Sequence, residues 1–116
     1  MTVEKFYEYI RGDYAGTKAR LMTDERILRF VNKFPADGSY QLLLDSLASS
    51  NVEEAFRAAH TIKGVAQNLG FTALYLSSQE VTEILRGGSL DVADKMPKLT
   101  ECYELTIDGI AKLNEE

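Results

Sequence analysis

The sequence predicts an all-α fold, an up-down antiparallel four-helix bundle with short additional helices at its N-terminus. Apolar residues recur at helical spacing along most of the chain, and no alternating run rich in Val, Ile and Thr indicates a strand. Short connections near residues 50, 70 and 88 make successive helices antiparallel neighbours. Of the 116 residues, 45% are hydrophobic and 27% are charged, so we expect residues 1–116 to form a single globular domain.

The chain opens with short helical elements. The first helix is expected to end at Gly12. A second stretch runs from Asp13-Tyr14 to about Leu21, although Gly16 weakens it. Thr23-Asp24 is a typical N-terminal cap for a third helix. The apolar stripe of the first helix consists of Val3, Phe6, Tyr7 and Ile10.

Pro35 leaves two interpretations of residues 24–49. The proline either stops the preceding helix, with Asp37-Gly38-Ser39 as the turn before a restart, or bends one continuous helix. The sequence does not decide between them. The apolar residues on either side of the proline are Ile27, Leu28, Phe30, Val31 and Phe34, then Tyr40, Leu43, Leu44 and Leu47.

A longer helix is predicted between Asn51 and Gly70. Asn51 has a glutamate three residues later, which resembles a capping box, and Gly70 suits the position after a helix C-terminus. Another helix is predicted over 71–86. The apolar stripes of these helices indicate core packing rather than a cofactor site.

Gly87-Gly88 ends that helix and leads to the last one. Ser89 or Asp91 is expected to provide its N-terminal cap. Pro97 falls in its first or second turn, which predicts a modest kink.

Composition and charge exclude several classes of protein. A net charge of −5 without clustered Lys and Arg argues against nucleic acid as the main partner. No apolar stretch approaches the ~20 residues of a membrane span, and the N-terminus lacks the pattern of a secretory signal. One cysteine and one histidine are too few nitrogen and sulfur ligands for zinc. We expect a cytoplasmic, monomeric protein without a metal or cofactor, in which Cys102 is a small buried hydrophobe.

His60 is the only histidine. At about 100° per residue, it falls just outside the buried arc of its helix, on a shoulder shared with Arg57, Gly64 and Gln67. Lys63 falls nearer the core edge, so its stem must extend outward past the helix. This placement gives the imidazole solvent on one side.

The residues near His60 suit a nucleophile presented to another protein. Imidazole titrates near neutral pH and is a good nitrogen nucleophile. Lys63 can attract an anion, and Gly64 gives up about 1 kcal/mol of helix propensity, which requires a reason. No Ser-His-Asp set or phosphate-binding glycine loop is present, so we expect no autonomous kinase activity. Taken alone, these residues favour a surface histidine, a solvated lysine and a packing glycine in a structural helical bundle.

The segment Ala59-His60-Thr61-Ile62-Lys63-Gly64, followed by Ala66, Asn68-Leu69-Gly70 and Leu74, resembles the histidine-containing phosphotransfer (HPt) domain family. The resemblance covers roughly residues 12–86 and includes Gly12-Asp13-Tyr14, Arg20-Leu21 and the Phe30/Phe34 helix. It implies a four-helix bundle with His60 as phosphoacceptor on the second bundle helix.

The resemblance also implies roles for the neighbours of His60. Lys63 would steady the phosphoryl group, Gly64 would leave room for the partner, and Arg57 and Gln67 would line the docking surface. Phe71, with Tyr75, would extend an apolar docking patch, although core or edge packing is the stronger alternative for these two. An amide from the following helix would orient the imidazole, and the candidates are Gln79 and Thr82. Val65 departs from the small residue common after the glycine and could narrow the docking surface.

The partners implied are receiver domains of response regulators, with a hybrid histidine kinase as a further candidate. One receiver phosphoaspartate would donate the phosphoryl group and a second receiver would accept it; magnesium would belong to the receiver. The alternative function is an HPt-like module that binds and sequesters a receiver or kinase without transferring phosphate.

Overall fold

The computed structural model describes residues 1–115, and in this range every regular element is a helix. The all-α prediction is therefore confirmed. The elements are α1 (Val3–Tyr9), α2 (Tyr14–Leu21), α3 (Asp24–Val31), a short 3₁₀ turn η1 (Phe34–Ala36), α4 (Ser39–Ala48), α5 (Val52–Leu69), α6 (Thr72–Arg86) and α7 (Met96–Leu113).

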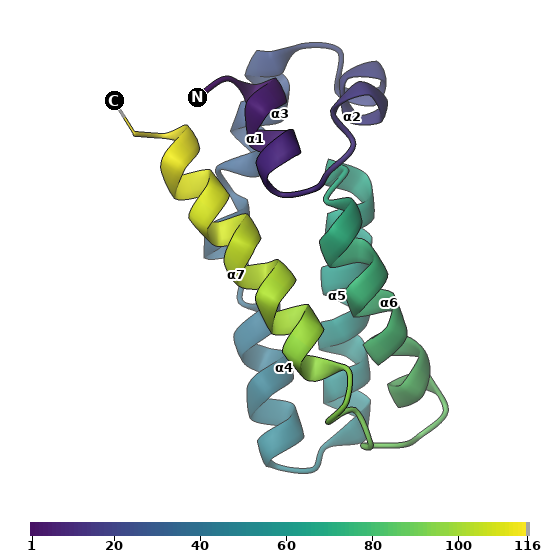
Figure 1. The fold of residues 1–116 in the computed structure, drawn as a ribbon. Coiled ribbons are helices and arrows are strands. Elements are labelled where there is room, and N and C mark those ends of the chain that lie inside the picture. Colours follow the sequence, from purple (N-terminus) through teal and green to yellow (C-terminus); the bar gives the residue numbers. More distant parts are fainter. Residues whose placement is uncertain (116) are drawn as a thin grey trace.

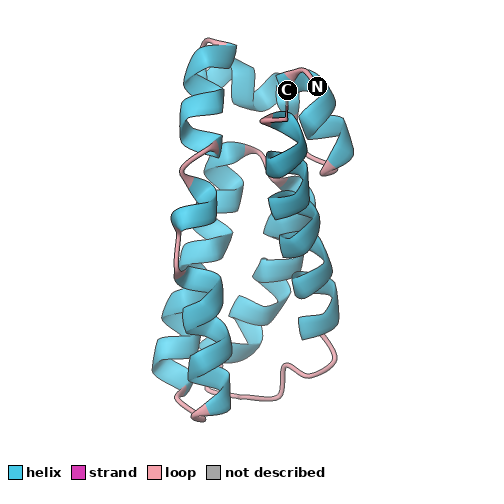
Figure 2. Ribbon diagram, turned by 90° about the vertical axis from the view of Figure 1, so that its left-hand side faces the viewer, coloured by secondary structure: helices cyan, strands magenta, loops and turns pink. Residues whose placement is uncertain are grey.

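Helices α4 to α7 lie side by side as an elongated bundle, and α1 to α3 cover one end of it (Figure 1). The molecule measures 41 × 26 × 21 Å. Helix α5 packs between α4 and α6, and α6 also packs against α7. Most connections gather at the two ends of the bundle, and both termini lie at the end covered by the short helices (Figure 2). One flank of α5 remains open to solvent.

Side-chain caps fix the starts of several helices. Thr23 accepts from the Arg26 N–H at the start of α3, as the sequence predicts, and Asp13 accepts from the Gly16 N–H at the start of α2, a cap that the sequence analysis does not include. Asn51 accepts from the Glu54 N–H at the start of α5, but the reciprocal half of the capping box is replaced: the Asn51 N–H donates to the Ser46 carbonyl. Each cap satisfies one of the free N–H groups of a first helical turn.

At Pro35 the structure adopts the first of the two interpretations. Helix α3 ends at Val31, Pro35 lies in the η1 turn, and α4 starts afresh at Ser39. The Ser39 N–H donates to the Asp37 carboxylate at 2.8 Å, which stabilises the turn between them.

The end of α1 differs from the prediction. The helix ends at Tyr9, and Arg11 rather than Gly12 takes the left-handed conformation, with φ of 59°. Gly12 is required for a different reason, because a Cβ there would lie 2.6 Å from the Gly70 carbonyl oxygen.

The start of the last helix also differs. Helix α7 begins only at Met96, so neither Ser89 nor Asp91 caps it, and its connection to α6 is longer than expected. The Ser89 hydroxyl instead accepts from the Asp91 N–H within that connection. Pro97 lies in the first turn of α7, where no intrahelical N–H bond is lost, so the reason to expect a kink disappears.

The core is continuous from the bundle into the covered end, where aromatic rings meet around Phe71. This ring contacts Phe34 edge-on at 5.3 Å between centroids and Phe6 edge-on at 6.0 Å. Cys102 is buried on α7, as predicted. The largest fully buried side chains are Tyr7, Phe6, Phe71, Ile10, Ile27, Leu43, Leu74, Leu99, Val31 and Val81.

The N-terminal helices fasten onto the C-terminus of α5 through hydrogen bonds that we call the clamp. The Tyr7 hydroxyl donates to the Leu69 carbonyl at 2.7 Å, and the Thr17 hydroxyl donates to the same oxygen at 3.1 Å. The Asp13 N–H donates to the Gly70 carbonyl at 2.8 Å. Arg20 Nη2 donates to the Asn68 carbonyl at 3.0 Å. The clamp thus satisfies carbonyls that a helix end otherwise leaves free.

Candidate functional site

His60 lies on the exposed side of α5, beyond the edge of the buried face, as the helical spacing predicts. Together with Lys63, Gly64 and Gln67 it forms what we call the His60 face. The imidazole lies nearly parallel to the Phe56 ring, with centroids 5.7 Å apart and planes 15° apart. The Arg86 guanidinium carbon, from α6, lies 5.0 Å from the centre of the same Phe56 ring.

Phe56 therefore packs against one face of the imidazole, a contact that the sequence analysis does not predict. The signal was available, because residues four apart in a helix are neighbours on its surface. No side-chain hydrogen bond among residues 1–115 involves the imidazole. Thr82 is buried and its hydroxyl donates to the Ser78 carbonyl at 2.7 Å. Gln79 is half-buried, and neither candidate orients the ring in this structure.

The two cations nearest to His60 in sequence differ in their pairing. Arg57 Nη1 lies 2.7 Å from Glu54 Oε1, in a bridge whose arginine side chain is 69% exposed. Lys63 is half-buried and forms no salt bridge within the part of the chain that the structure describes. Its ammonium group is free to pair with an anion at the His60 face, whereas the Arg57 charge is already opposed by a carboxylate.

No neighbouring atom in the described chain requires a glycine at position 64. A Cβ built on it meets no atom within 4 Å, and its φ is not in the left-handed range. Alanine would fit and would favour the helix by about 1 kcal/mol. No contact within residues 1–115 therefore supports the packing-glycine alternative.

Beyond Gly64, toward the C-terminus of α5, the surface is hollowed. One shallow hollow is lined by Gly64, Gln67, Asn68 and Arg20, and an adjoining one is lined in part by Gln67, Arg20 and Tyr75. Helical spacing predicts this position for Gln67, beside Gly64. Arg20 is not predictable in this way, because it comes from α2 and reaches the site only through the tertiary fold.

Two expectations about the docking surface need correction. Phe71 is 0% exposed and lies within the aromatic core, so it cannot contact a partner, and its assignment as a partner-binding residue is wrong. The core-packing alternative holds instead. Val65 is half-buried beside Phe30, Phe34 and Leu69 on the opposite flank of α5, so it does not narrow the approach to His60.

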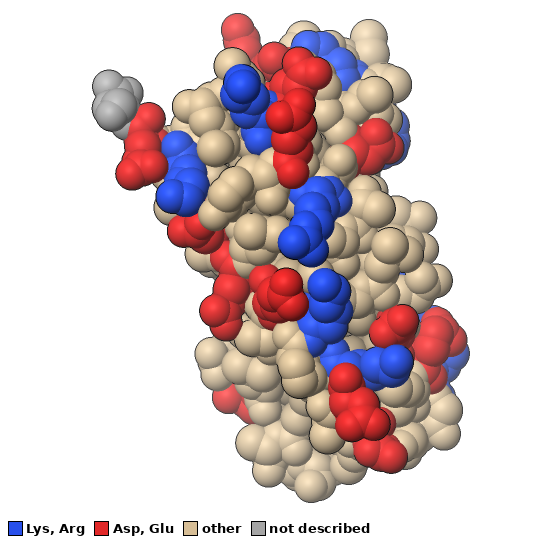
Figure 3. Space-filling view, viewed as in Figure 1, with Lys and Arg blue, Asp and Glu red and all other residues tan. Residues whose placement is uncertain are grey.

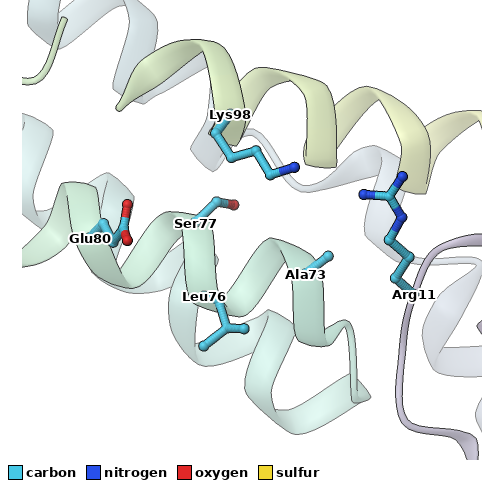
Figure 4. Close-up of a pocket in the computed structure, with 6 residues that line it drawn as sticks. All are labelled: Arg11, Ala73, Leu76, Ser77, Glu80 and Lys98. Atoms are coloured by element: carbon cyan, nitrogen blue, oxygen red, sulfur yellow. The ribbon is translucent and has the colours of Figure 1, made fainter. Parts of the chain in front are cut away.

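A third hollow lies between α6 and α7, on a face where Lys and Arg side chains run down the middle with acidic side chains beside them (Figure 3). It is lined by Arg11, Lys98, Glu80, Ser77, Leu76 and Ala73 (Figure 4). The Ser77 hydroxyl donates to the Leu74 carbonyl at 3.1 Å, so its proton is engaged within α6. This hollow shares no lining residue with those beside His60.

None of the helices formed by residues 1–115 is both long and apolar enough to cross a membrane. In the same range no group of three or more His, Cys, Asp or Glu side chains is placed to hold a metal ion.

Comparison with known families gives one match. The family model described as "Hpt domain" matches residues 36–109, which is more than half of the chain and includes His60, Lys63 and Gly64. Searches of curated proteins and of solved structures found no significant match. Hpt domains are four-helix bundles that carry out phosphotransfer in phosphorelays and interact with receiver domains. The exposed histidine on a bundle helix agrees with that match, and the chain belongs to the Hpt domain family.

Proposed function

We propose that His60 accepts a phosphoryl group from the phosphoaspartate of one receiver domain and passes it to the aspartate of another. A ring nitrogen of neutral His60 supplies the electron pair for a new P–N bond. The P–O bond to the donor breaks, its aspartate leaves as a carboxylate, and the proton stays on the other ring nitrogen. Onward transfer reverses these steps on the second receiver, so positioning supplies most of the catalysis.

The observation that carries this proposal is the pairing of an exposed His60 with a glycine that the fold does not need. A partner that reaches the imidazole must pass over the next helical turn, where Gly64 lies. The open space above Gly64 is what such an approach requires. A purely structural role for the bundle does not explain why this space is left open.

The neighbouring side chains have separate roles in the proposal. Phe56 limits rotation of the imidazole through their stacked contact. Lys63 offsets the negative charge of the phosphoryl group, because its ammonium group forms no salt bridge with a carboxylate of residues 1–115. Gln67 lines the docking surface, and Arg57 contributes mainly after it separates from Glu54.

The partners are single receiver domains that bind one at a time to the same face of a monomeric protein. The magnesium ion of the reaction belongs to the receiver's acidic site, and we assign no metal to this chain. We place the relay in the cytoplasm.

The test is to incubate the purified protein with a panel of phosphorylated receiver domains and to measure intact mass. An added phosphoryl group that is acid-labile, alkali-stable and absent from His60→Gln supports the relay. Phosphoramidate, a small chemical donor, serves as a control for imidazole reactivity without docking.

The outcomes separate the candidate functions. Binding to a receiver without any label, in a protein that phosphoramidate does label, would support the sequestering module. Neither label nor binding with any receiver would leave only a helical bundle with an exposed histidine.

A further inference from the structure

We propose that Arg20, on α2, selects among receiver domains by pairing with an acidic side chain beside the receiver's phosphorylation site. This inference rests on the proposed function, because it assigns a partner-recognition residue to the same face. Arg20 lies on α2, outside residues 36–109, the part of the chain that the family model matches.

The position of Arg20 is fixed by the fold. Its Nη2 donates to the carbonyls of Asn68, at 3.0 Å, and Gln67, at 3.4 Å. These carbonyls belong to the last turn of α5, where the helix dipole favours a cation. The guanidinium is thus held against the end of the helix that carries His60.

The same guanidinium faces the docking surface. Arg20 lines the shallow hollow beside Gly64 and Gln67, as well as the adjoining hollow toward Tyr75. A partner that comes close enough to reach His60 over Gly64 also covers this region. Arg20 is exposed in the isolated protein, so docking would bring its charge into an interface.

The remaining bonding capacity of Arg20 determines the chemistry of the partner. Both of its hydrogen bonds use Nη2, which leaves the donors on Nε and Nη1 without a partner among residues 1–115. Arg20 forms no salt bridge in that range. The Asp13 carboxylate also lines the adjoining hollow, but it accepts from the Gly16 N–H as the cap of α2 and forms no salt bridge with Arg20. A partner carboxylate is the group that best uses the free donors of the guanidinium.

The experiment measures transfer from phosphorylated receivers as a function of receiver concentration, for wild type, Arg20→Gln and Arg20→Lys. We expect Arg20→Gln to raise the receiver concentration for half-maximal transfer about fivefold for some receivers and little for others. The maximal rate should not change, and Arg20→Lys should restore part of the loss because it keeps the charge. Arg29→Gln is the matched control, since it removes the same charge from the exposed surface of α3.

Labelling by phosphoramidate separates partner recognition from a merely structural role for Arg20. We expect equal labelling of wild type and Arg20→Gln, because that reaction needs no docking. The inference is overturned if Arg20→Gln lowers the maximal rate alone, affects all receivers equally, or matches Arg29→Gln. If wild type takes label from phosphoramidate but from no receiver, the proposed function fails, and this inference fails with it.

Discussion

Gly64 and Gly70 lie near the end of the same helix, and the fold treats them in opposite ways. Gly70 has φ of 72°, and a Cβ on it would lie 1.9 Å from the Thr17 hydroxyl oxygen and 2.8 Å from the Asp13 carbonyl oxygen. A Cβ on Gly64 would meet nothing within 4 Å. The first glycine is required by the chain's own packing, and the second is not.

The difference separates two regions of one helix. At the clamp, a Tyr, a Thr and an Arg from the N-terminal helices cover the last carbonyls of α5. At the His60 face, no other part of the described chain covers Gly64. Stability is therefore expected to depend on the clamp and transfer on the His60 face, with Arg20 at the boundary between the two.

Gly70→Ala should have the largest effect on stability. It forces a Cβ into the left-handed region and against Thr17, so we expect it to lower the free energy of unfolding by about 3 kcal/mol. Urea unfolding followed by circular dichroism measures the change. Gly64→Ala is the matched control and should raise the same free energy by up to about 1 kcal/mol. Equal midpoints for the two variants would remove the distinction between the regions.

Gly64→Leu should have the largest effect on transfer. The side chain has room in the free protein, so helical content should be unchanged. It would obstruct a docked receiver, and a clash of about 3 kcal/mol lowers transfer about 100-fold. Transfer reactions quenched at successive times and analysed by intact mass give the rate. Phosphoramidate labelling is the control that needs no docking. Transfer at the wild-type rate would show that Gly64 does not clear the approach.

Lys63→Ala and Arg57→Ala test whether the pairing of the two cations matters. We expect Lys63→Ala to slow transfer, or to shorten the lifetime of phosphohistidine, about fivefold. Arg57→Ala should do less, because Glu54 already opposes its charge at 2.7 Å. Single-turnover transfer and decay of the isolated phosphoprotein supply the rates. Equal losses in both variants would contradict the assignment of Lys63 as the principal cation.

Tyr7→Phe should have the smallest effect at neutral pH, a loss of about 1 kcal/mol from the hydrogen bond to the Leu69 carbonyl. Burial raises the pKa of Tyr7 to about 12, so the folded state keeps its proton when an unfolded tyrosine loses it near pH 10. Wild type therefore loses this contribution as pH rises from about 10 to 12. The difference in the free energy of unfolding between wild type and Tyr7→Phe narrows over the same range.

Urea midpoints across that pH range measure the gap. Tyr75→Phe, at a half-buried tyrosine outside the clamp, is the control and should keep the alkaline loss of wild type. A gap that widens with pH would contradict the assignment.

The sequence predicts local features of this fold well. The caps at Thr23 and Asn51 depend on a few adjacent residues, and both are present in the structure. The exposure of His60 follows from helical spacing alone. The family resemblance that the sequence suggested is confirmed by the match over residues 36–109.

Features that depend on distant parts of the chain could not be predicted in this way. The burial of Phe71 comes from Phe6 and Phe34, which the fold brings around it. Arg20 reaches the His60 face only because α2 docks on the end of α5. The late start of α7 reflects a connection whose cap-forming residues, Ser89 and Asp91, bond to each other instead. The specific roles of Lys63, Gly64 and Gln67 stay predictions until transfer is measured.

The clamp has a consequence for the order in which the protein folds. Helices α5 and α6 are joined only by Gly70 and Phe71, so their pairing closes a short loop, whereas the bond from Tyr7 to Leu69 spans 62 positions of sequence. Contacts between distant residues are costly to form early, so the α5–α6 hairpin is expected in the folding nucleus and the clamp after the rate-limiting step. Weakening the clamp should then speed unfolding and leave the refolding rate almost unchanged.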